Sequence, residues 1–192
     1  MARAPLNCRE QCTVEGLDGS ASAAVEQAFR LVYAEVFSEA PYNEREDDVA
    51  AAFRRFRSQT RKPTFRGALA RTESAGEPVG MAYGYALGSN TGWWDQLTEA
   101  VPDDMRREDG RRTFGLMELA VRKAWREQGI ARRLHQVLLS GLGAERVILN
   151  VHPESGAASA AYRSWGYHKV GEARPWEGAA LHDVLLLDLL NR

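Results

Sequence analysis

The stretch from Glu118 to Arg133 reads ELAVRKAWREQGIARR, and the interpretation of the rest of the chain starts from it. A strand-like segment ends at Val121, a polar turn follows, and Gly129 begins a helical pattern. The first amides of a helix lack intrahelical partners and carry positive partial charge, so they bind anions. Small residues at positions 129 and 131 let a phosphate approach the backbone, and four arginines flank them: Arg122, Arg126, Arg132 and Arg133. The segment predicts a diphosphate cradle, with an ordinary basic helix start on the surface as the alternative.

Other phosphate-binding and nucleophile motifs are missing from the sequence. There is no GxxxxGK followed by Ser or Thr, which excludes a Walker loop. No GxGxxG follows an early strand, so a dinucleotide-binding fold is unsupported. The absence of GxSxG removes the common hydrolase interpretation.

Composition restricts the class of protein further. The chain has 192 residues, of which 44% are hydrophobic and 27% charged, as expected for a globular protein of one domain. Its 25 Lys and Arg against 26 Asp and Glu argue against a nucleic-acid binder. No apolar run reaches the ~20 residues that cross a bilayer, and we expect no signal peptide. We therefore expect a cytoplasmic protein that binds neither a membrane nor nucleic acid.

Metal chemistry is not expected. The two cysteines, Cys8 and Cys12, are four residues apart and have no Cys or His pair at zinc spacing, so they are interpreted as reduced thiols. The four histidines are scattered and form no HExxH or similar cluster.

Hydrophobic periodicity predicts the order of the elements. We expect strands at 12–17, 64–71, 79–87, 114–121, 146–151, 167–171 and 181–189, and helices at 22–38, 43–61, 129–142 and 156–164. Asn43 is the predicted N-cap of the second helix, with Glu46 in the capping-box position. The long connection 88–112 is expected to hold a short helix with Trp94, Leu97 and Val101. The prediction is one α/β domain over 1–192, with an irregular tail over about 1–20.

Two motifs resemble those of the GNAT superfamily of N-acetyltransferases. The segment Arg126–Ala131 fits that family's acetyl-CoA loop, Q/R-x-x-G-x-G/A, with Arg126, Gln128, Gly129 and Ala131 in register. About thirty residues later, AASAAYRSWGY (Ala157–Tyr167) resembles the family's A-x-x-x-Y-x-x-x-G-F/Y segment. The resemblance covers residues 64–189 well. Ser155 stands where many members carry Asn, and Ala131 replaces the commoner Gly.

The resemblance implies a fold and a cofactor. The fold is a mixed, mostly antiparallel central sheet with splayed parallel fourth and fifth strands, flanked by helices. The cofactor is acetyl-CoA as co-substrate: its pantetheine arm would pair with the backbone of Leu119 and Val121, and its pyrophosphate would bind the amides of the cradle and the Arg126 side chain. The full set of implied cofactor contacts is Leu119, Ala120, Val121, Arg126, Glu127, Gln128, Gly129, Ile130, Ala131, Arg132, Asn150 and Ser155.

Two residues are candidates for acid–base chemistry. Tyr162 is the candidate acid, because a phenol of pKa ~10 is protonated at neutral pH and can donate to a thiolate; the alternative is a core tyrosine. Glu118 is the candidate base, because it shares one strand face with Phe114 and Leu116, where a carboxylate is either paired or raised in pKa. Its alternative is a structural ion pair with a nearby arginine. His152 is a weaker candidate base.

The acceptor side is expected to be aromatic. The resemblance assigns it to the first two helices, the connection between them and the long connection 88–112, which contribute Tyr33, Phe37, Tyr42, Trp93 and Trp94, with Asp95 and Glu99. Such residues suit a cationic amine, although the two tryptophans also fit core packing. The function predicted is N-acetylation of a small amine, since the Trp-containing connection favours a closed pocket. The alternatives are a protein lysine or N-terminal acetyltransferase and a non-catalytic acyl-CoA-binding module. Dimers are common in the resembling family.

Overall fold

The computed structural model describes residues 12–190 and arranges their strands in one sheet. The strands are β1 (Cys12–Leu17), β2 (Arg66–Thr72), β3 (Pro78–Ala86), β4 (Thr113–Val121), β5 (Arg146–Val151), β6 (His168–Ala173) and β7 (His182–Asp188). The helices are α1 (Gly19–Ala24), α2 (Glu26–Phe37), α3 (Glu46–Gln59), α4 (Asp103–Arg106), α5 (Ile130–Leu139) and α6 (Gly156–Ser164), with short 3₁₀ turns η1 (Trp93–Gln96) and η2 (Lys123–Trp125).

The sheet has the order β1-β2-β3-β4-β5-β7-β6. Strands β4 and β5 pair in parallel, whereas β1 with β2, β2 with β3, β5 with β7 and β6 with β7 are antiparallel. The parallel ladder joins Thr113–Gly115 to Arg146–Ile148 and ends there. This ending agrees with the implied splay, and the predicted mixed, mostly antiparallel fold class is confirmed.

The chain divides into two compact units. The first unit comprises Met1–Gly84 and Glu118–Ser140, and the second comprises Tyr85–Met117 and Gly141–Arg192. The single domain predicted over 1–192 stays a prediction.

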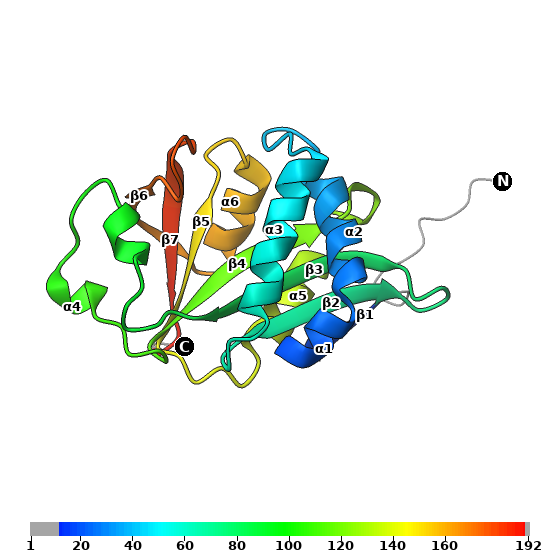
Figure 1. Cartoon of the computed structure of the whole chain (residues 1–192), viewed down its shortest axis with the longest axis horizontal. Coiled ribbons are helices and arrows are strands. Elements are labelled where there is room, and N and C mark those ends of the chain that lie inside the picture. Colours follow the sequence, from blue (N-terminus) through cyan, green and yellow to red (C-terminus); the bar gives the residue numbers. More distant parts are fainter. Residues whose placement is uncertain (1–11, 191–192) are drawn as a thin grey trace. The chain divides into compact units, whose positions relative to one another are not determined.

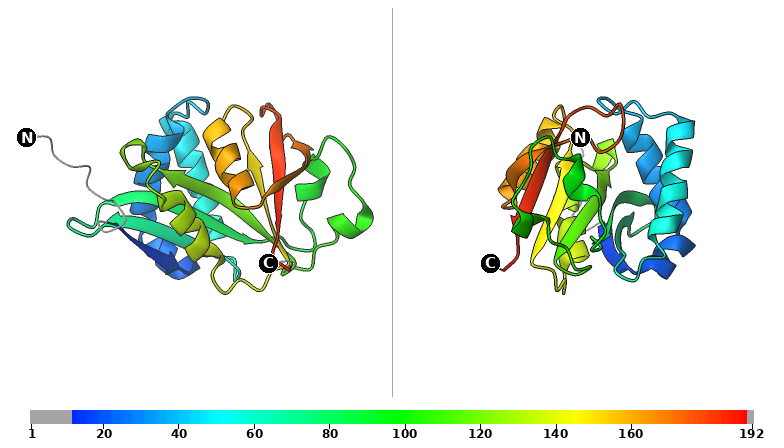
Figure 2. Two further views of the ribbon diagram at one scale, coloured as in Figure 1. Left: turned by 180° about the vertical axis from the view of Figure 1, so that it is seen from behind. Right: turned by 60° about the vertical axis from the view of Figure 1, so that its left-hand side comes forward.

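Aromatic rings form the core of the first unit on one face of its strands. Helices α1, α2 and α3 cover this face, and α5 covers the opposite one (Figures 1 and 2). Phe56 of α3 lies at the centre, with ring centroids 5.1 Å from Phe29 and 5.0 Å from Tyr83 of β3. Phe53 packs 5.3 Å from the same ring. The predicted apolar faces of α2 and α3 are thus what attaches both helices to the sheet.

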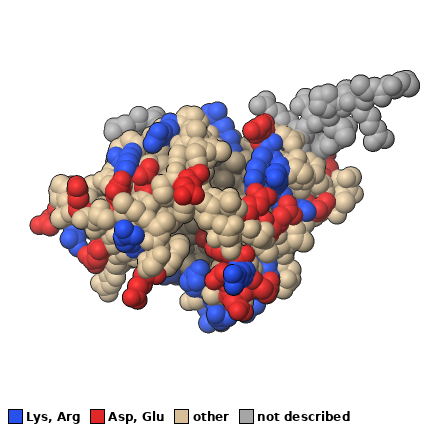
Figure 3. Space-filling view, turned by 90° about the horizontal axis from the view of Figure 1, so that it is seen from above, with Lys and Arg blue, Asp and Glu red and all other residues tan. Residues whose placement is uncertain are grey.

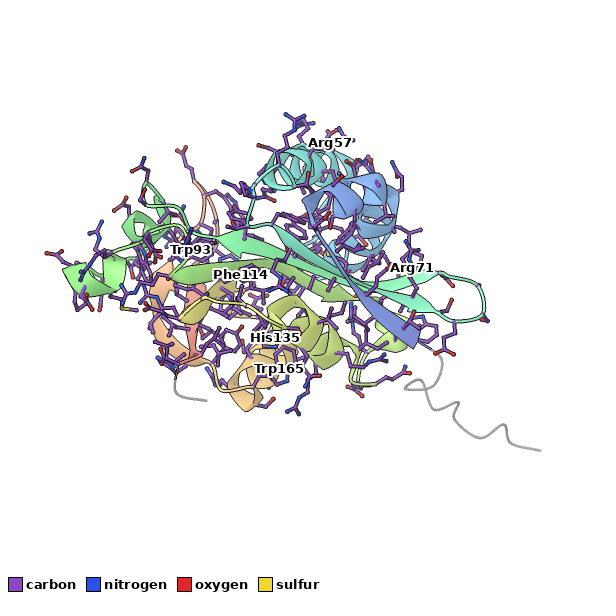
Figure 4. The ribbon with its side chains drawn as sticks, turned by 90° about the horizontal axis from the view of Figure 1, so that it is seen from below. Arg57, Arg71, Trp93, Phe114, His135 and Trp165 are labelled. Carbon is purple, nitrogen blue, oxygen red and sulfur yellow. The ribbon has the colours of Figure 1, made fainter. Side chains whose placement is uncertain are left out.

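Helix α5 lies close to the sheet because β3 has a glycine beneath it. A Cβ at Gly80 would lie 3.0 Å from Leu134 Cδ1, 3.2 Å from the Ala120 carbonyl oxygen and 3.3 Å from Ile130 Cγ2. Ile130 and Leu134 are fully buried, and His135 lies on the same helix (Figure 4). A side chain at this position would force Leu134, Ile130 or the Ala120 carbonyl to shift, and glycine avoids this.

Two predictions about the N-terminal elements are wrong. The helix expected at 22–38 is divided at Val25 into α1 and α2. Helix α1 already begins at Gly19, because the Asp18 carboxylate accepts a hydrogen bond from the Ala21 amide at 2.8 Å. The irregular tail therefore does not extend to residue 20, and its residues 1–11, with Cys8, lie outside the described part of the chain.

The predicted N-cap of the second long helix is also corrected. Asn43 has a positive φ of 50°, so it cannot start the helix. Arg45 is the N-cap, and the Asp48 carboxylate accepts its backbone amide at 2.9 Å. The capping box was thus expected in the right segment but two residues too early.

The second unit has its own core, formed around β5 and β7. Leu87, Trp94, Ile148, Val184 and Leu186 are among its buried members. The helix expected to carry Trp94, Leu97 and Val101 is only the turn η1; Leu97 and Val101 lie beyond it and pack against the core. The long connection is therefore attached to the sheet by its apolar side chains.

A buried ion pair ties this connection to the start of β4 and β5. The Glu108 carboxylate accepts hydrogen bonds from Arg146 at 3.1 Å, from the Thr113 hydroxyl at 2.8 Å and from Trp94 Nε1 at 3.0 Å. The Arg146 guanidinium also lies 5.1 Å from the Trp94 ring centroid. Each of these groups is buried, so Glu108 is the one negative charge that compensates Arg146 in this network.

Glu108→Gln is expected to lower the free energy of unfolding by about 3 kcal/mol, because it leaves the Arg146 charge buried without its partner. The matched control is Glu145→Gln, which breaks a half-exposed pair with Arg112 and should cost below about 1 kcal/mol. Urea denaturation of the two variants measures the difference. Equal losses would contradict the role given to the network.

The surface charge and the hydropathy of the helices indicate no particular binding partner. Lys and Arg are interspersed with Asp and Glu over the face in Figure 3, without a large patch of one sign. Within residues 12–190, no helix is both long and apolar enough to cross a bilayer. The same residues contain no group of three or more His, Cys, Asp or Glu side chains placed to hold a metal ion.

Candidate active site

The predicted phosphate cradle forms the turn between β4 and α5. Strand β4 ends at Val121, η2 follows, and the chain then reverses through Glu127 and Gly129, whose φ angles are 60° and 78°. The Gln128 side-chain amide donates to the Ala124 carbonyl at 3.1 Å and so closes the turn. A Cβ at Gly129 would have no heavy atom within 4 Å, so the space above this glycine is open.

Three backbone amides begin α5 without an acceptor inside the helix. The first intrahelical hydrogen bond runs from the Arg133 amide to the Gly129 carbonyl at 3.1 Å. The amides of Ile130, Ala131 and Arg132 precede it and are therefore available to an anion. Together with the open space at Gly129, this geometry fits a pyrophosphate.

The arginines around the cradle are mostly engaged within the first unit. Arg126 donates to the Val121 carbonyl at 3.0 Å and to the Glu39 carboxylate at 2.9 Å. Arg122 pairs with Glu35 and Glu77, and Arg133 donates to a backbone carbonyl of β1 at 2.9 Å. Arg132 is exposed at the start of α5. For Arg126 to hold a phosphate, its bond to Glu39 has to be exchanged.

Glu118 lies next to the cradle sequence, on β4, and its side chain is partly buried. Burial and, to a smaller extent, the charge of Glu44 raise the pKa of its carboxyl group to about 8, although the charge of Arg55 acts to lower it. Among the described residues no ion pair includes Glu118, since Arg122 and Arg126 bind other carboxylates. The structural ion pair considered as its alternative is therefore not formed, and the group can exchange a proton near neutral pH.

Three of the predicted acceptor residues form an aromatic cluster near Glu118. Tyr33 and Phe37 of α2 stack with ring centroids 4.2 Å apart, and Phe37 meets Tyr42 at 4.8 Å. Burial, then the charges of Glu118 and Glu44, raise the pKa of the Tyr33 phenol, so it remains a hydrogen-bond donor. Its hydroxyl donates to Glu44 Oε1 at 3.0 Å.

Glu44 was not among the predicted site residues. In the sequence it is one of several acids at the start of the second helix, where the helix dipole explains them. Only the tertiary contact with Tyr33 distinguishes it from its neighbours. Its position in the connection that the resemblance assigned to the acceptor was the one available signal.

The two tryptophans of the acceptor prediction belong to the core of the second unit. Trp94 is 4% exposed and Trp93 packs against the same core (Figure 4 labels Trp93). Asp95 pairs with Arg106, and Glu99 is exposed. Core packing, the alternative considered for the tryptophans, is what the structure shows, so they give no support to a closed acceptor pocket.

The candidate acid Tyr162 lies on α6 in the second unit. It is 8% exposed, and its ring meets those of Trp165 and Tyr167 edge-on, each with centroids 5.4 Å apart. Ser155 is the residue before α6, and its carbonyl accepts the Ser159 amide at 3.0 Å. These contacts orient the start of the helix and the tyrosine ring.

Asn150 lies on β5 in the same unit, paired with Val184 of β7. Its side-chain oxygen is buried and has no hydrogen-bond partner within the described part of the chain. A buried amide oxygen without a donor is costly, so Asn150 fits a ligand that brings an N–H group, as the amides of a pantetheine arm do.

His152 is less suited to act as a base than its position suggests. Its Nδ1 accepts the Glu154 amide at 3.2 Å, which occupies the lone pair of the neutral ring. Its ring also lies edge-on to His182, with centroids 5.2 Å apart. Glu118 remains the better candidate.

Solved structures of acetyltransferases share this fold. Ard1 from Thermoplasma volcanium matches with a TM-score of 0.61 and 13% identity, over 93% of this chain and 97% of that one. A ribosomal-protein alanine N-acetyltransferase from Escherichia coli matches with a TM-score of 0.57 and 16% identity, over 93% and 94%. A chain of the NatC complex bound to Gag peptide and CoA gives 0.60 and 15%, over 93% and 99%. At these identities the similarity concerns the fold alone.

Sequence comparison identifies the family. No curated protein matches the chain. A model of the acetyltransferase (GNAT) family matches residues 23–167, which is most of the chain and includes the cradle, Glu118 and Tyr162. The two motifs that resembled this family lie within the matched residues. The chain therefore belongs to the acetyltransferase (GNAT) family.

Proposed function

We propose that this protein transfers an acetyl group from acetyl-CoA to a primary amine of a small molecule. The observation that carries the proposal is Glu118, a partly buried carboxyl group outside every described ion pair, with a pKa raised to about 8. An amine is protonated at neutral pH and cannot attack until it loses a proton. A base that titrates in this range is suited to remove it.

The phosphate site is proposed from the backbone amides that begin α5 and have no acceptor inside the helix. The amides of Ile130, Ala131 and Arg132 bind the pyrophosphate, and Gly129 leaves room for it. The other implied contacts are the β4 backbone at Leu119, Ala120 and Val121, the turn residues Arg126, Glu127 and Gln128, and Asn150 and Ser155. When bound, acetyl-CoA supplies a thioester carbonyl that an amine can attack.

Two side chains are proposed to move protons. Glu118 accepts a proton from the acceptor ammonium, which exposes the nitrogen lone pair that forms the new C–N bond. Tyr162 donates its phenolic proton to the sulfur as the C–S bond breaks, so the leaving group departs as a thiol. The second nitrogen proton and the proton held by Glu118 pass to solvent, and the phenolate regains one proton from solvent, so one proton is released in all. Protons and charges then balance over one turnover.

The proposed acceptor is a small primary amine. The cluster of Tyr33, Phe37 and Tyr42, beside the carboxyl groups of Glu44 and Glu118, supports a small amine. The two tryptophans do not, since they lie in the core of the second unit. A protein N-terminal or lysine acetyltransferase and a non-catalytic acyl-CoA-binding module are the alternatives. We further propose that the protein is cytoplasmic, needs neither nucleic acid nor a membrane as a partner, and forms a homodimer.

A screen of free-thiol release from acetyl-CoA tests the function. The wild-type protein is assayed with a panel of small primary amines and with peptides that carry either a free N-terminus or an internal lysine. Turnover with small amines and little with peptides is the expected result. Turnover only with peptides would support the protein acetyltransferase, and CoA binding without turnover would support the non-catalytic module.

Tyr162→Phe is expected to lower kcat by about 10²-fold while the Kd for acetyl-CoA stays within about twofold, because the hydroxyl that donates the proton is removed and the ring is kept. The matched control is Tyr167→Phe, which removes a hydroxyl from a buried ring in contact with Tyr162. Steady-state kinetics and calorimetry measure the two effects. If turnover is unchanged in Tyr162→Phe, this tyrosine is not the acid.

A further inference from the structure

We infer that Glu44 and Glu118 form a carboxylate pair that binds the acceptor as its ammonium ion, with Tyr33 holding Glu44 in place. The inference rests on the proposed function and makes it more specific. It assigns the recognition of the acceptor's charge to Glu44 and the removal of its proton to Glu118. The acceptor is therefore a cation when it binds, and neutral alcohols or amides of the same shape are excluded.

The hydrogen bonds of Glu44 leave one oxygen for a ligand. Oε1 accepts the Tyr33 hydroxyl at 3.0 Å. Oε2 is buried and has no hydrogen-bond partner among residues 12–190. A buried carboxylate oxygen without a donor is unfavourable, and an ammonium ion offers three N–H donors together with a positive charge.

Among the described residues, the groups that face Glu44 and Glu118 supply too little positive charge to compensate two ionised carboxylates. Those facing it are Tyr33 of α2, Asp48 and Arg55 of α3, Tyr83 of β3, and the two carboxyl groups themselves. Burial raises the pKa of both Glu44 and Glu118, and among residues 12–190 the exposed Arg55 is the cation that lowers the pKa of each. A bound cation therefore favours the ionised form of both carboxyl groups.

The aromatic cluster favours the same ligand. Tyr33 stacks on Phe37, and Phe37 contacts Tyr42, so rings lie beside the carboxylate that accepts the Tyr33 hydroxyl. Faces of aromatic rings attract ammonium groups. After proton transfer to Glu118, Glu44 keeps its negative charge near the amine and stabilises the positive charge that develops on nitrogen as it attacks the carbonyl.

The first experiment needs no known acceptor. The carboxyl carbons of ¹³C-glutamate-labelled protein are titrated by NMR, with the Glu118 signal assigned by its loss in Glu118→Gln. Methylammonium chloride is the probe, and sodium chloride at equal ionic strength is its control. Methylammonium should lower the midpoint of Glu118 in the wild type more than sodium does. In Glu44→Gln the midpoint should already be lower without the probe, and the difference between the two salts should disappear.

The matched control is Glu46→Gln, which neutralises an exposed carboxylate two residues along the chain, paired with Arg30. It should behave as the wild type does. A Glu118 midpoint that is the same in Glu44→Gln as in the wild type would overturn the inference, and so would an equal response of the wild type to both salts.

The second experiment uses an amine accepted in the thiol-release screen. Glu44→Gln should raise the KM for the amine about 10-fold or more, the effect of losing one charged hydrogen bond, with the Kd for acetyl-CoA unchanged. An unchanged KM for the amine contradicts the inference while leaving the acetyltransferase proposal intact. If no amine is accepted, the proposed function fails, and the titration still decides whether the pair binds an ammonium ion.

Discussion

Glu118→Gln is expected to lower kcat by about 10²- to 10⁴-fold, the range that general base catalysis contributes. The variant keeps the size and hydrogen-bonding shape of the side chain but cannot accept the ammonium proton. The wild-type rate should also depend on pH. Below about pH 8 the carboxyl group is mostly protonated and inactive as a base, so kcat/KM should rise with pH and level off above that value. Glu118→Gln should lose this ionisation from its profile.

Stability provides an independent check on the same residue. A carboxyl group whose pKa is raised in the folded state binds more protons there than in the unfolded chain. The free energy of unfolding therefore falls as the pH rises from the ordinary pKa of a glutamate towards about 8. Glu118→Gln removes this loss and should melt at a higher temperature than the wild type at neutral pH. Glu15→Gln on exposed β1 serves as the control. A variant that is less stable than the wild type and retains its turnover would show that Glu118 has only a structural role.

Gly129→Glu is expected to abolish acetyl-CoA binding. Its carboxylate would enter the open space above the turn, where we place the pyrophosphate, and would repel it. The milder Gly129→Ala should also weaken binding, because a methyl group occupies the same space and the φ of 78° is unfavourable for alanine. Isothermal titration calorimetry with CoA measures both variants.

The control for backbone strain is Gly76→Ala in the turn between β2 and β3. Gly76 also has a positive φ, of 64°, and no heavy atom near its would-be Cβ. The free energy of unfolding of Gly76→Ala should fall by about 1 kcal/mol, as that of Gly129→Ala should. Gly76→Ala should nevertheless keep its affinity for CoA. If Gly129→Glu binds CoA as the wild type does, the phosphate site lies elsewhere.

The sequence predicted the sheet better than the helix ends. The bounds expected for β5 and α6 are those observed, because short apolar runs and a following glycine mark them clearly. The break at Val25 and the N-cap at Arg45 were missed. The start of α1 at Gly19 and the N-cap at Arg45 depend on the Asp18 and Asp48 carboxylates, which accept backbone amides and compete with equally plausible caps nearby.

The candidate site was predicted where local pattern determines it. Alternation along β4 was enough to select Glu118, and the turn chemistry selected Gly129. Glu44 could not be found in this way, since its importance arises from a hydrogen bond to a residue eleven positions away. Trp94 was instead predicted as a binding residue and is not placed as one. An aromatic residue in a long connection fits either role, and only the hydrogen bond from its indole to the buried Glu108 carboxylate assigns it to the core.

The close contact between Gly80 and α5 links the residue type at position 80 to the proposed binding of the CoA phosphates. Any larger residue at position 80 presses on Leu134 and Ile130, and Ile130 is the residue that opens the helix whose first amides we assign to the phosphates. A substitution at position 80 would therefore displace the first amides of α5, where we place the phosphates, even in a chain that still folds. A larger side chain at position 80 is therefore expected to weaken binding of CoA as well as to disturb the packing of α5.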